Sequence, residues 1–380
     1  MSGLAGRRAV LQVHPTRRCN LACAHCYSSS GPDQRAELDV RVLAGAVADA
    51  AALGYRQLSV SGGEPFLYGP LAELLRAGRA AGMANTVTTN GMLLSPRRLD
   101  PVVPYLDLLA VSVDGPPAEH NLMRRDPAAF ERMLRYLPAV RAAGVPFGVI
   151  FTLTRYNADQ LEWLVSFAAE QGAGLVQVHP LTQIGRARTD LPAAGPDATE
   201  LLAALAELDR LQRLYPGLEL RLDAATTGQL AAHRAELVAD PDGPLADLVP
   251  VLLVDDHGAI TPLTHDLDRS YGLGSLAYAR LSELAAAWQV TTAGRLAELL
   301  AAAHDRLVRP GADPIAYWYD TVAELSRSMP AAMPAAMPVP APGQMPAAVP
   351  ASISAAVLAA VPAAMPASMP AAALAPVLAG

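Results

Sequence analysis

The sequence contains no lysine, so its 29 basic residues are all arginines, which excludes Schiff-base chemistry on a lysine. No long basic run exists and the formal net charge is −7, so the clustered positive charge that a nucleic-acid backbone requires is missing. The chain also lacks an uncharged, proline-free stretch of about 20 apolar residues and a recognisable signal peptide. We therefore expect a cytoplasmic protein that binds neither nucleic acid nor membrane.

Cysteine is scarce, because the chain has only three cysteines and all of them lie between residues 19 and 26. Thiols stay reduced in the cytoplasm, and an odd, tightly clustered set indicates metal binding rather than disulfides. The total of 380 residues allows one large domain and a smaller one, each with a packed core.

Short apolar runs alternate with amphipathic segments in the first half of the chain. The runs are rich in Val, Leu and Ile and are predicted as strands over 9–14, 57–60, 86–89, 108–113, 147–152 and 175–179. Apolar spacing of three to four residues predicts helices over 38–53, 70–81, 95–103, 128–143 and 159–170. Such alternation is typical of parallel βα units. We predict an α/β fold in which residues 1–190 form a partial (β/α)6 barrel of the TIM type, with its chemistry at the carboxyl ends of the strands.

The remainder of the chain divides into two parts. Residues 191–328 are predicted as a smaller α+β extension, with helices over 200–214, 280–288 and 292–307 and a strand over 218–222. Two apolar runs flank the turn signal Asp255-Asp256-His257-Gly258, which predicts a β-hairpin. Residues 329–380 carry no charge and repeat proline every few residues, which blocks both helix and sheet, so a disordered tail is predicted.

Cys19, Cys23 and Cys26 follow the first predicted strand with C-x3-C-x2-C spacing. Thiolates on such a compact loop are suitable ligands for a [4Fe–4S] cluster. Because the cubane has four irons, one iron would lack a protein ligand and could chelate the amine and carboxylate of a small molecule. A zinc site completed by His25 or His14 is an alternative, although no second cysteine pair exists. A ferredoxin role is disfavoured because a distant fourth cysteine is absent.

The run Cys19-Asn-Leu-Ala-Cys23-Ala-His-Cys26-Tyr27 resembles the cluster loop of radical S-adenosylmethionine (SAM) enzymes, in particular the branch with a SPASM or twitch extension. The resemblance covers about residues 9–265 and implies one [4Fe–4S] cluster on the three cysteines, with SAM at the open iron. Reductive cleavage of SAM would give a 5′-deoxyadenosyl radical that abstracts hydrogen from a substrate. An electron donor such as a flavodoxin or ferredoxin is also implied.

The turn Ser61-Gly62-Gly63-Glu64-Pro65 follows the second strand and resembles the family's GGEP motif, whose glutamate binds the SAM amine. The segment Thr88-Thr89-Asn90-Gly91 resembles a TNG element near the cofactor, although a plain strand-ending turn is the alternative. By the same resemblance, Ser112 and Arg124 bind the SAM carboxylate and ribose, for which a hydroxyl and a planar guanidinium are suited.

Three assignments from the resemblance are less direct. Arg125 is adjacent to Arg124, so the carboxylate-binding arginine could be either. Asp114 is assigned to substrate or ribose, with a turn cap as its alternative. Gly185 lies in a GRA element that closes the adenine pocket in the family. The implied SAM contacts are therefore Tyr27, Gly62, Gly63, Glu64, Pro65, Asn90, Ser112, Asp114, Arg124 and Gly185.

The sequence departs from the family pattern because no cysteine follows Cys26, and Leu263 stands where the extension's motif has a cysteine. A second cluster, a cysteine hydrogen donor and methyl transfer through cysteine are therefore excluded. Tyr68 or Tyr271 is the predicted donor if one is needed. Aspartates and histidines near the hairpin suggest a metal or a general base, but a hairpin turn explains them better; they are Asp255, Asp256, His257 and His265. Trp163, Trp288 and Trp318 are predicted as packing residues.

The predicted function is hydrogen abstraction from a ribosomally made peptide, with a cofactor precursor or another small molecule as the alternative substrate. The peptide assignment depends on the resemblance, because a fold does not determine a function. The alternative of another class is a non-enzymatic iron–sulfur or zinc protein that acts as a redox sensor or scaffold. Such a protein would not need Glu64, Ser112 or Arg124, so the three motifs argue against it.

Overall fold

The computed structural model describes residues 9–331. Its centre is a ten-stranded sheet in the order β11-β10-β9-β1-β2-β3-β4-β5-β6-β7. The strands are β1 Val10–Val13, β2 Gln57–Val60, β3 Ala84–Thr89, β4 Leu108–Ser112, β5 Phe147–Leu153, β6 Leu175–Pro180, β7 Glu219–Leu222, β9 Val251–Val254, β10 Ala259–Pro262 and β11 Gly274–Ser275. All pairs from β9 through β1 to β7 are parallel, and β10 and β11 pair antiparallel at one edge.

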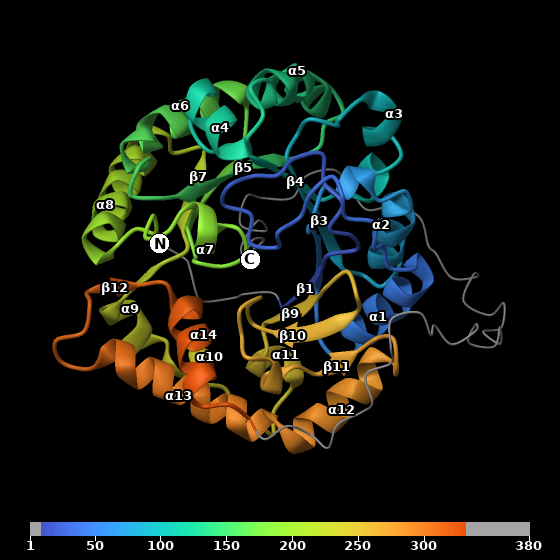
Figure 1. Ribbon diagram of the computed structural model, residues 1–380, viewed down its shortest axis with the longest axis vertical. Coiled ribbons are helices and arrows are strands. Elements are labelled where there is room, and N and C mark those ends of the chain that lie inside the picture. Colours follow the sequence, from blue (N-terminus) through green and yellow to red (C-terminus); the bar gives the residue numbers. More distant parts are fainter. Residues whose placement is uncertain (1–8, 332–380) are drawn as a thin grey trace.

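Helices follow the strands and cover the outer face of the curved sheet (Figure 1). The helices between residues 40 and 214 are α1 Val40–Ala52, α2 Leu71–Ala80, α3 Pro96–Leu99, α4 Pro117–Arg124, α5 Ala129–Ala142, α6 Leu161–Gln171, α7 Ala187–Asp190 and α8 Ala198–Leu214, with 3-10 turns η1 Pro65–Leu67, η2 Val103–Tyr105 and η3 Ala158–Gln160. Of these, the short helix α7 lies inside the ring of helices in Figure 1. The predicted α/β class and partial barrel are confirmed, and each of the six predicted strands is present within one or two residues.

Local sequence explains these elements. Strands β1 and β2 are buried along their whole length, as expected for parallel strands covered on both faces. Helix α1 is capped by Asp39, whose carboxylate accepts a hydrogen bond from the Arg41 amide, and such a cap satisfies one free amide of the first turn. Helix α8 begins with a reciprocal capping box between Asp197 and Glu200.

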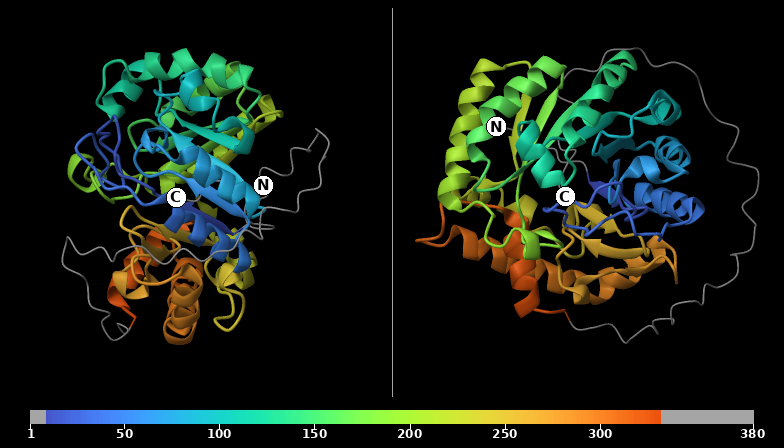
Figure 2. Two further views of the ribbon diagram at one scale, coloured as in Figure 1. Left: turned by 90° about the vertical axis from the view of Figure 1, so that its right-hand side faces the viewer. Right: turned by 45° about the horizontal axis from the view of Figure 1, so that its top comes forward.

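The C-terminal region packs beneath the barrel as a layer of helices (Figure 2). Its elements are β8 Ala225–Thr226, α9 Thr227–Ala232, α10 Arg234–Leu237, α11 Leu245–Leu248, η4 Arg269–Tyr271, α12 Leu281–Thr291, α13 Ala293–Val308, β12 Ile315–Ala316 and α14 Trp318–Ser328. Helix α12 contacts α1, where the buried Asp49 carboxylate accepts hydrogen bonds from Arg280 and Ser282. One cluster of buried apolar side chains runs from the barrel into α12, α13 and α14.

The boundary predicted at residue 190 does not coincide with an edge of the sheet. Strand β7 continues the parallel order beside β6, and β9 pairs with β1 on the opposite side. The seven parallel strands from β1 to β7 therefore form the barrel wall, and the hairpin β9–β10 extends it. The predicted hairpin is present, with its turn at residues 255–258. The predicted tail lies outside the described residues from position 332 onward. Among residues 9–331, no helix has the length and apolarity needed to cross a membrane.

Candidate active site

The carboxyl ends of the barrel strands surround a pocket of about 190 Å³. Loops after β1, β2 and β3, the end of β4 and the end of α4 form one part of its wall. Other lining residues come from β5, β6 and the segment after it, β9, the segment after β10 and α14. The structure thus brings most predicted site residues together. Those that line the pocket are Cys19, Cys23, Cys26, Tyr27, Gly62, Gly63, Asn90, Ser112 and Arg124.

The cysteine loop presents three free thiols to this pocket. Cys19 and Cys23 are buried, whereas Cys26 is half-buried. Burial, reinforced by the nearby Glu64 carboxylate, raises the pKa of Cys19 to about 12, so this thiol is protonated in the metal-free protein. A metal must therefore displace the proton when it binds.

The donor set fits an iron–sulfur cluster. Within residues 9–331, no three His, Cys, Asp or Glu side chains are grouped closely enough to share one metal ion. A [4Fe–4S] cluster does not need that grouping, because each thiolate binds a different iron. His25 lies between two of the cysteines in sequence and lines the pocket, and its buried Nδ1 atom has no hydrogen-bond partner in the described part of the chain. Burial lowers the pKa of His25 to about 4, so the ring is neutral at pH 7.

The two glycines after β2 are required by backbone packing against the cysteine loop. Gly62 has φ 103°, and a Cβ there would lie 2.8 Å from the Thr16 carbonyl oxygen. A Cβ on Gly63 would lie 2.2 Å from the Arg18 carbonyl oxygen. The Gly63 and Glu64 amides instead donate to the Thr16 and Arg18 carbonyls, each at 2.9 Å. The Gly-Gly pair therefore joins the loop after β2 to the cysteine loop.

Glu64 is fully buried behind the pocket wall rather than in it. Its carboxylate accepts hydrogen bonds from the Thr89 hydroxyl at 2.8 Å, the Asn90 amide at 2.9 Å and the Phe66 amide at 3.1 Å. Burial raises the pKa of Glu64, although these hydrogen bonds act in the opposite direction. The residue thus couples the loops after β2 and β3, and Pro65 begins the 3-10 turn η1 beside it.

Arg124 and Asp114 form a buried ion pair next to Cys23. The Arg124 Nε atom lies 2.6 Å from Asp114 Oδ2, and its Nη1 atom lies 3.9 Å from Cys23 Sγ. Burial opposes the charge on Asp114, but Arg124, His25 and His120 outweigh it and lower the pKa of Asp114 to about 2. Arg124 lines the pocket, whereas Asp114 lies behind it. The neighbouring Arg125 pairs instead with Asp190 at 2.8 Å.

Gly185 and Arg186, which follow β6, contact the backbone of the cysteine loop. A Cβ on Gly185 would lie 2.2 Å from the Tyr27 carbonyl oxygen, and the Arg186 amide donates to the Cys26 carbonyl at 3.0 Å. The Arg186 guanidinium also binds the Cys23 and Ser30 carbonyls, at 2.9 Å and 2.6 Å. Sequence analysis missed this role of Arg186, although the residue lies inside the GRA element.

A stack of three rings joins the barrel to the segment after β10. His265 lies 4.6 Å from His14 and 4.7 Å from Tyr27 between ring centroids. The Tyr27 hydroxyl is 3.2 Å from His14 Nε2 and 3.4 Å from the Ser61 hydroxyl. Burial lowers the pKa of both histidines, that of His265 to about 4. The buried Nε2 atom of His265 has no hydrogen-bond partner among the described residues.

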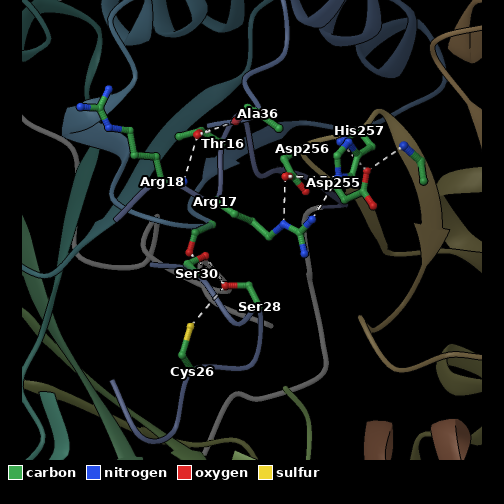
Figure 3. A network of polar contacts seen from close by, with 12 residues as sticks. Thr16, Arg17, Arg18, Cys26, Ser28, Ser30, Ala36, Asp255, Asp256 and His257 are labelled. Atoms are coloured by element: carbon green, nitrogen blue, oxygen red, sulfur yellow. Dashed lines mark hydrogen bonds and ion pairs between the residues drawn. The ribbon is translucent and has the colours of Figure 1, made fainter. Parts of the chain in front are cut away.

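The β9–β10 hairpin contacts the cysteine loop at a second place (Figure 3). Arg17 binds Asp256 at 2.9 Å and His257 at 3.0 Å. Asp255 accepts hydrogen bonds from the His257 and Ala259 amides, both at 2.9 Å, which closes the turn. The four residues that the sequence places near the hairpin therefore have different locations. Asp255, Asp256 and His257 form the turn and its ion pair with Arg17, whereas His265 lines the pocket.

The two tyrosines predicted as hydrogen donors do not line the pocket. Tyr68 donates to the Leu38 carbonyl at 2.8 Å, and Tyr271 donates to the Met329 carbonyl. The tryptophans pack as predicted, for example Trp163 stacked 5.1 Å from Phe167. Pocket residues that sequence analysis left without a role include Gln12, Thr152, Tyr317 and Tyr319, which are isolated in sequence and carry no local motif.

Residues 13–168 match the model of the radical SAM superfamily. The chain is 33% identical over 210 residues to the PqqA peptide cyclase of Ruegeria pomeroyi, covering 54% of each chain. It is 34% identical over 174 residues to the AdoMet-dependent heme synthase of Methanosarcina barkeri, covering 45% of this chain and 50% of that protein. The chain thus spans about half the length of the curated relatives it matches.

Solved structures share the fold at low sequence identity. Streptococcus suis SuiB bound to its precursor peptide SuiA matches with a TM-score of 0.55 and 15% identity, over 68% of this chain and 60% of that one. At this identity the match concerns the fold alone. The superfamily's members use a [4Fe–4S] cluster and SAM, and the matched region contains the three cysteines and the motifs after β2, β3 and β4. Residues 13–168 are therefore a domain of the radical SAM superfamily.

Proposed function

We propose that this protein is a radical SAM enzyme in which Cys19, Cys23 and Cys26 hold one [4Fe–4S] cluster. One observation carries the proposal: the three thiols share a single pocket with residues at the carboxyl ends of β2, β3 and β4. When bound, the cluster and SAM supply a 5′-deoxyadenosyl radical that abstracts hydrogen from a substrate.

Different residues of the pocket wall are suited to bind different groups of SAM. Arg124 offers the guanidinium nitrogens that Asp114 does not use to a carboxylate. Ser112 and the Asn90 side chain provide polar groups at the ends of β4 and β3. Backbone atoms of Gly62 and Gly63 can approach a ligand closely because these residues have no Cβ. Tyr27 closes the wall next to Cys26.

The remaining predicted contacts lie behind this wall in the described protein. They are Glu64, Pro65, Asp114 and Gly185, none of which lines the pocket. They remain proposed SAM-site residues, because Glu64, Asp114 and Gly185 contact residues of the pocket wall and Pro65 directly follows Glu64. Glu64 joins the loops after β2 and β3, and Asp114 holds Arg124. A carboxylate oxygen accepts more than one hydrogen bond, so the three present donors leave Glu64 able to accept a SAM amine.

We propose a peptide as the substrate. Support comes from the relatives, since the PqqA peptide cyclase is named for a peptide and SuiB was solved with a precursor peptide. The match to a heme synthase favours the second candidate, a small molecule or cofactor precursor. A flavodoxin or ferredoxin is the proposed electron donor.

The first experiment is anaerobic reconstitution with iron and sulfide, followed by dithionite and SAM. We expect wild-type protein to form 5′-deoxyadenosine, measured by mass spectrometry, and Cys19→Ala to form none. A protein that binds zinc and little iron after this treatment would contradict the proposal. The Glu64→Ala variant distinguishes the enzyme from the non-enzymatic alternative. An enzyme should lose 5′-deoxyadenosine formation in this variant, whereas a sensor or scaffold would keep its iron-dependent property.

The substrate class is tested by adding candidates to the reconstituted protein. A short peptide encoded beside the gene should increase 5′-deoxyadenosine formation and change in mass. If only a tetrapyrrole or another small molecule does so, the peptide assignment is wrong while the radical chemistry stands.

A further inference from the structure

His179 and Asp223 lie outside the cofactor motifs and meet at the ends of neighbouring strands. His179 is the penultimate residue of β6, and Asp223 directly follows β7. Val178 is opposite Leu222 in the parallel register, so the next residue on each strand is opposite the other. The Asp223 amide donates to the Val178 carbonyl at 3.0 Å. The sheet itself therefore brings the two side chains together at the end of the barrel that holds the pocket.

The Asp223 carboxylate is held at both oxygens. Its Oδ2 atom pairs with His179 Nδ1, and its Oδ1 atom accepts a hydrogen bond from the Gln177 side chain. Within residues 9–331, neither His179 Nδ1 nor Asp223 Oδ2 has another hydrogen-bond partner. The His179 and Asp223 side chains are only 13% and 19% exposed, and Gln177 is buried. This arrangement gives the carboxylate one orientation relative to the imidazole ring.

The tautomer of His179 follows from its partner. An ionised carboxylate only accepts hydrogen bonds, so the neutral ring carries its hydrogen on Nδ1 and has a lone pair on Nε2. His179 lines the same pocket as the cysteines, whereas Asp223 does not. No residue of the described chain donates a hydrogen bond to Nε2 in this structure. The lone pair is therefore available to a molecule in the pocket.

Two other histidines line the pocket but are placed differently. His25 lies 3.8 Å from Asp114, a carboxylate already engaged by Arg124. His265 stacks on His14 and pairs with no carboxylate of the part of the chain that the structure describes. A carboxylate that belongs to one imidazole and fixes its tautomer is the arrangement that general bases use. Of the three rings, His179 alone has it.

We propose that His179 is an acid–base residue that acts on the substrate, with Asp223 as its positioning residue. The inference rests on the proposed function, because it requires a substrate beside the cysteine pocket. In the step, a polarised N–H, O–H or C–H bond of the substrate breaks, its proton moves to Nε2 and the electron pair stays on the substrate. The resulting imidazolium is stabilised by the Asp223 carboxylate. The substrate class is thus one with a polarised N–H, O–H or C–H bond whose proton His179 can accept.

The tautomer can be measured directly by long-range 1H–15N NMR on the full-length protein labelled at its histidines. His179→Gln identifies the His179 signals. We expect the wild type to show a protonated Nδ1 and a bare Nε2. In Asp223→Asn, the new amide can donate to Nδ1 and should move the hydrogen to Nε2. Glu219→Gln is the matched control, because this carboxylate on the same strand pairs with Arg221 and should leave the tautomer unchanged.

Access to the lone pair is measured with diethyl pyrocarbonate, which acylates a bare imidazole nitrogen. The reconstituted full-length protein is treated briefly and mapped by mass spectrometry. We expect modification of His179 to slow severalfold in Asp223→Asn and to stay at the wild-type rate in Glu219→Gln. A wild-type Nε2–H tautomer, or equal modification rates in wild type and Asp223→Asn, would overturn the proposal. Wild-type protein that has the expected tautomer yet forms no 5′-deoxyadenosine would instead contradict the proposed function.

Discussion

Residues 19–27 and residues 263–265 contribute to the same pocket, but they are built differently. The first segment supplies three cysteines and Tyr27 from one contiguous loop. The second supplies Leu263, Thr264 and His265 from a turn after β10, and its neighbours in the wall come from β6, β9 and α14. The two segments touch in the ring stack of His265 with Tyr27.

The comparison separates cofactor chemistry from substrate recognition. A cluster requires ligands at fixed spacing, which one short loop can provide. A substrate requires a shaped cavity with a few placed polar groups, which scattered side chains can provide. We infer that the segment with the cysteines serves the cofactor, and that the side from His179 to His265 serves the substrate.

The largest expected effect comes from the cysteine side. Cys23→Ser should reduce iron bound after reconstitution and lower 5′-deoxyadenosine formation by more than about 100-fold, because a lost ligand costs more than a lost second-sphere partner. Iron analysis and the 5′-deoxyadenosine assay measure both quantities. Leu263→Ala is the matched control on the other segment and should retain the cluster. Equal losses in the two variants would contradict the division between cofactor and substrate sides.

The buried pair behind the cysteines should dominate stability. Arg124→Leu leaves the Asp114 carboxylate buried without its partner, which should reduce the free energy of unfolding by about 3–5 kcal/mol. Urea unfolding of the cluster-free protein at pH 7 measures the change. Adding Asp114→Leu to the same chain removes the stranded charge and should restore part of the loss. A reduction below about 1 kcal/mol, the size of an exposed pair, would show that Asp114 is not isolated from solvent.

The contribution of residues 263–265 to the free energy of unfolding should depend on pH. Burial lowers the pKa of His265 to about 4, below the unfolded value of about 6.5. Between these values the unfolded chain binds more protons, so the free energy of unfolding falls as pH drops from 6.5 towards 4. Urea unfolding at pH 7 and pH 4.5 should show a fall that is about 2 kcal/mol smaller in His265→Gln than in wild type. His233→Gln, away from the pocket, is the control, and an identical fall in all three proteins would contradict the prediction.

The smallest effect is expected at the link between the hairpin and the cysteine loop. Arg17 is 33% exposed and binds the buried Asp256, so Arg17→Gln should cost about 1 kcal/mol. The loss should shrink in high salt, because salt screens the pair. Thermal unfolding at low and high ionic strength tests this, with Arg41→Gln as a control at the exposed pair with Asp39. A loss that does not depend on salt would assign Arg17 a packing role.

Much of the barrel and of the cofactor side could be predicted from local pattern. Strand β2, for example, is short and is followed directly by the motif with Gly62 and Gly63. The sequence therefore predicts both the strand and the position of these glycines at its carboxyl end. The same approach missed the role of Arg186, because its partners are backbone carbonyls of residues 23, 26 and 30. Every residue has a backbone carbonyl, so the amino-acid sequence does not indicate which carbonyls Arg186 binds.

The C-terminal part was harder to predict for a different physical reason. Strand β7 alternates charged and apolar residues and β9 is a short apolar run, and nothing in either sequence indicates that β7 pairs with β6 and β9 with β1. The predicted donors Tyr68 and Tyr271 illustrate the same limit, since their hydroxyls satisfy backbone carbonyls away from the pocket. Burial and partner cannot be deduced for an isolated tyrosine.

The sequence by itself determined the cofactor chemistry, because ligand spacing and turn glycines act over a few residues and tolerate little change. It also determined the alternation of strands and helices, because the spacing of apolar residues indicates which face of each element is buried. Only the tertiary structure decided which side chains complete the pocket. His179 meets Asp223 across 44 residues of chain through the register of β6 and β7, and His265 reaches Tyr27 because β9 pairs with β1. Contacts of that kind depend on strand order, which no local pattern encodes.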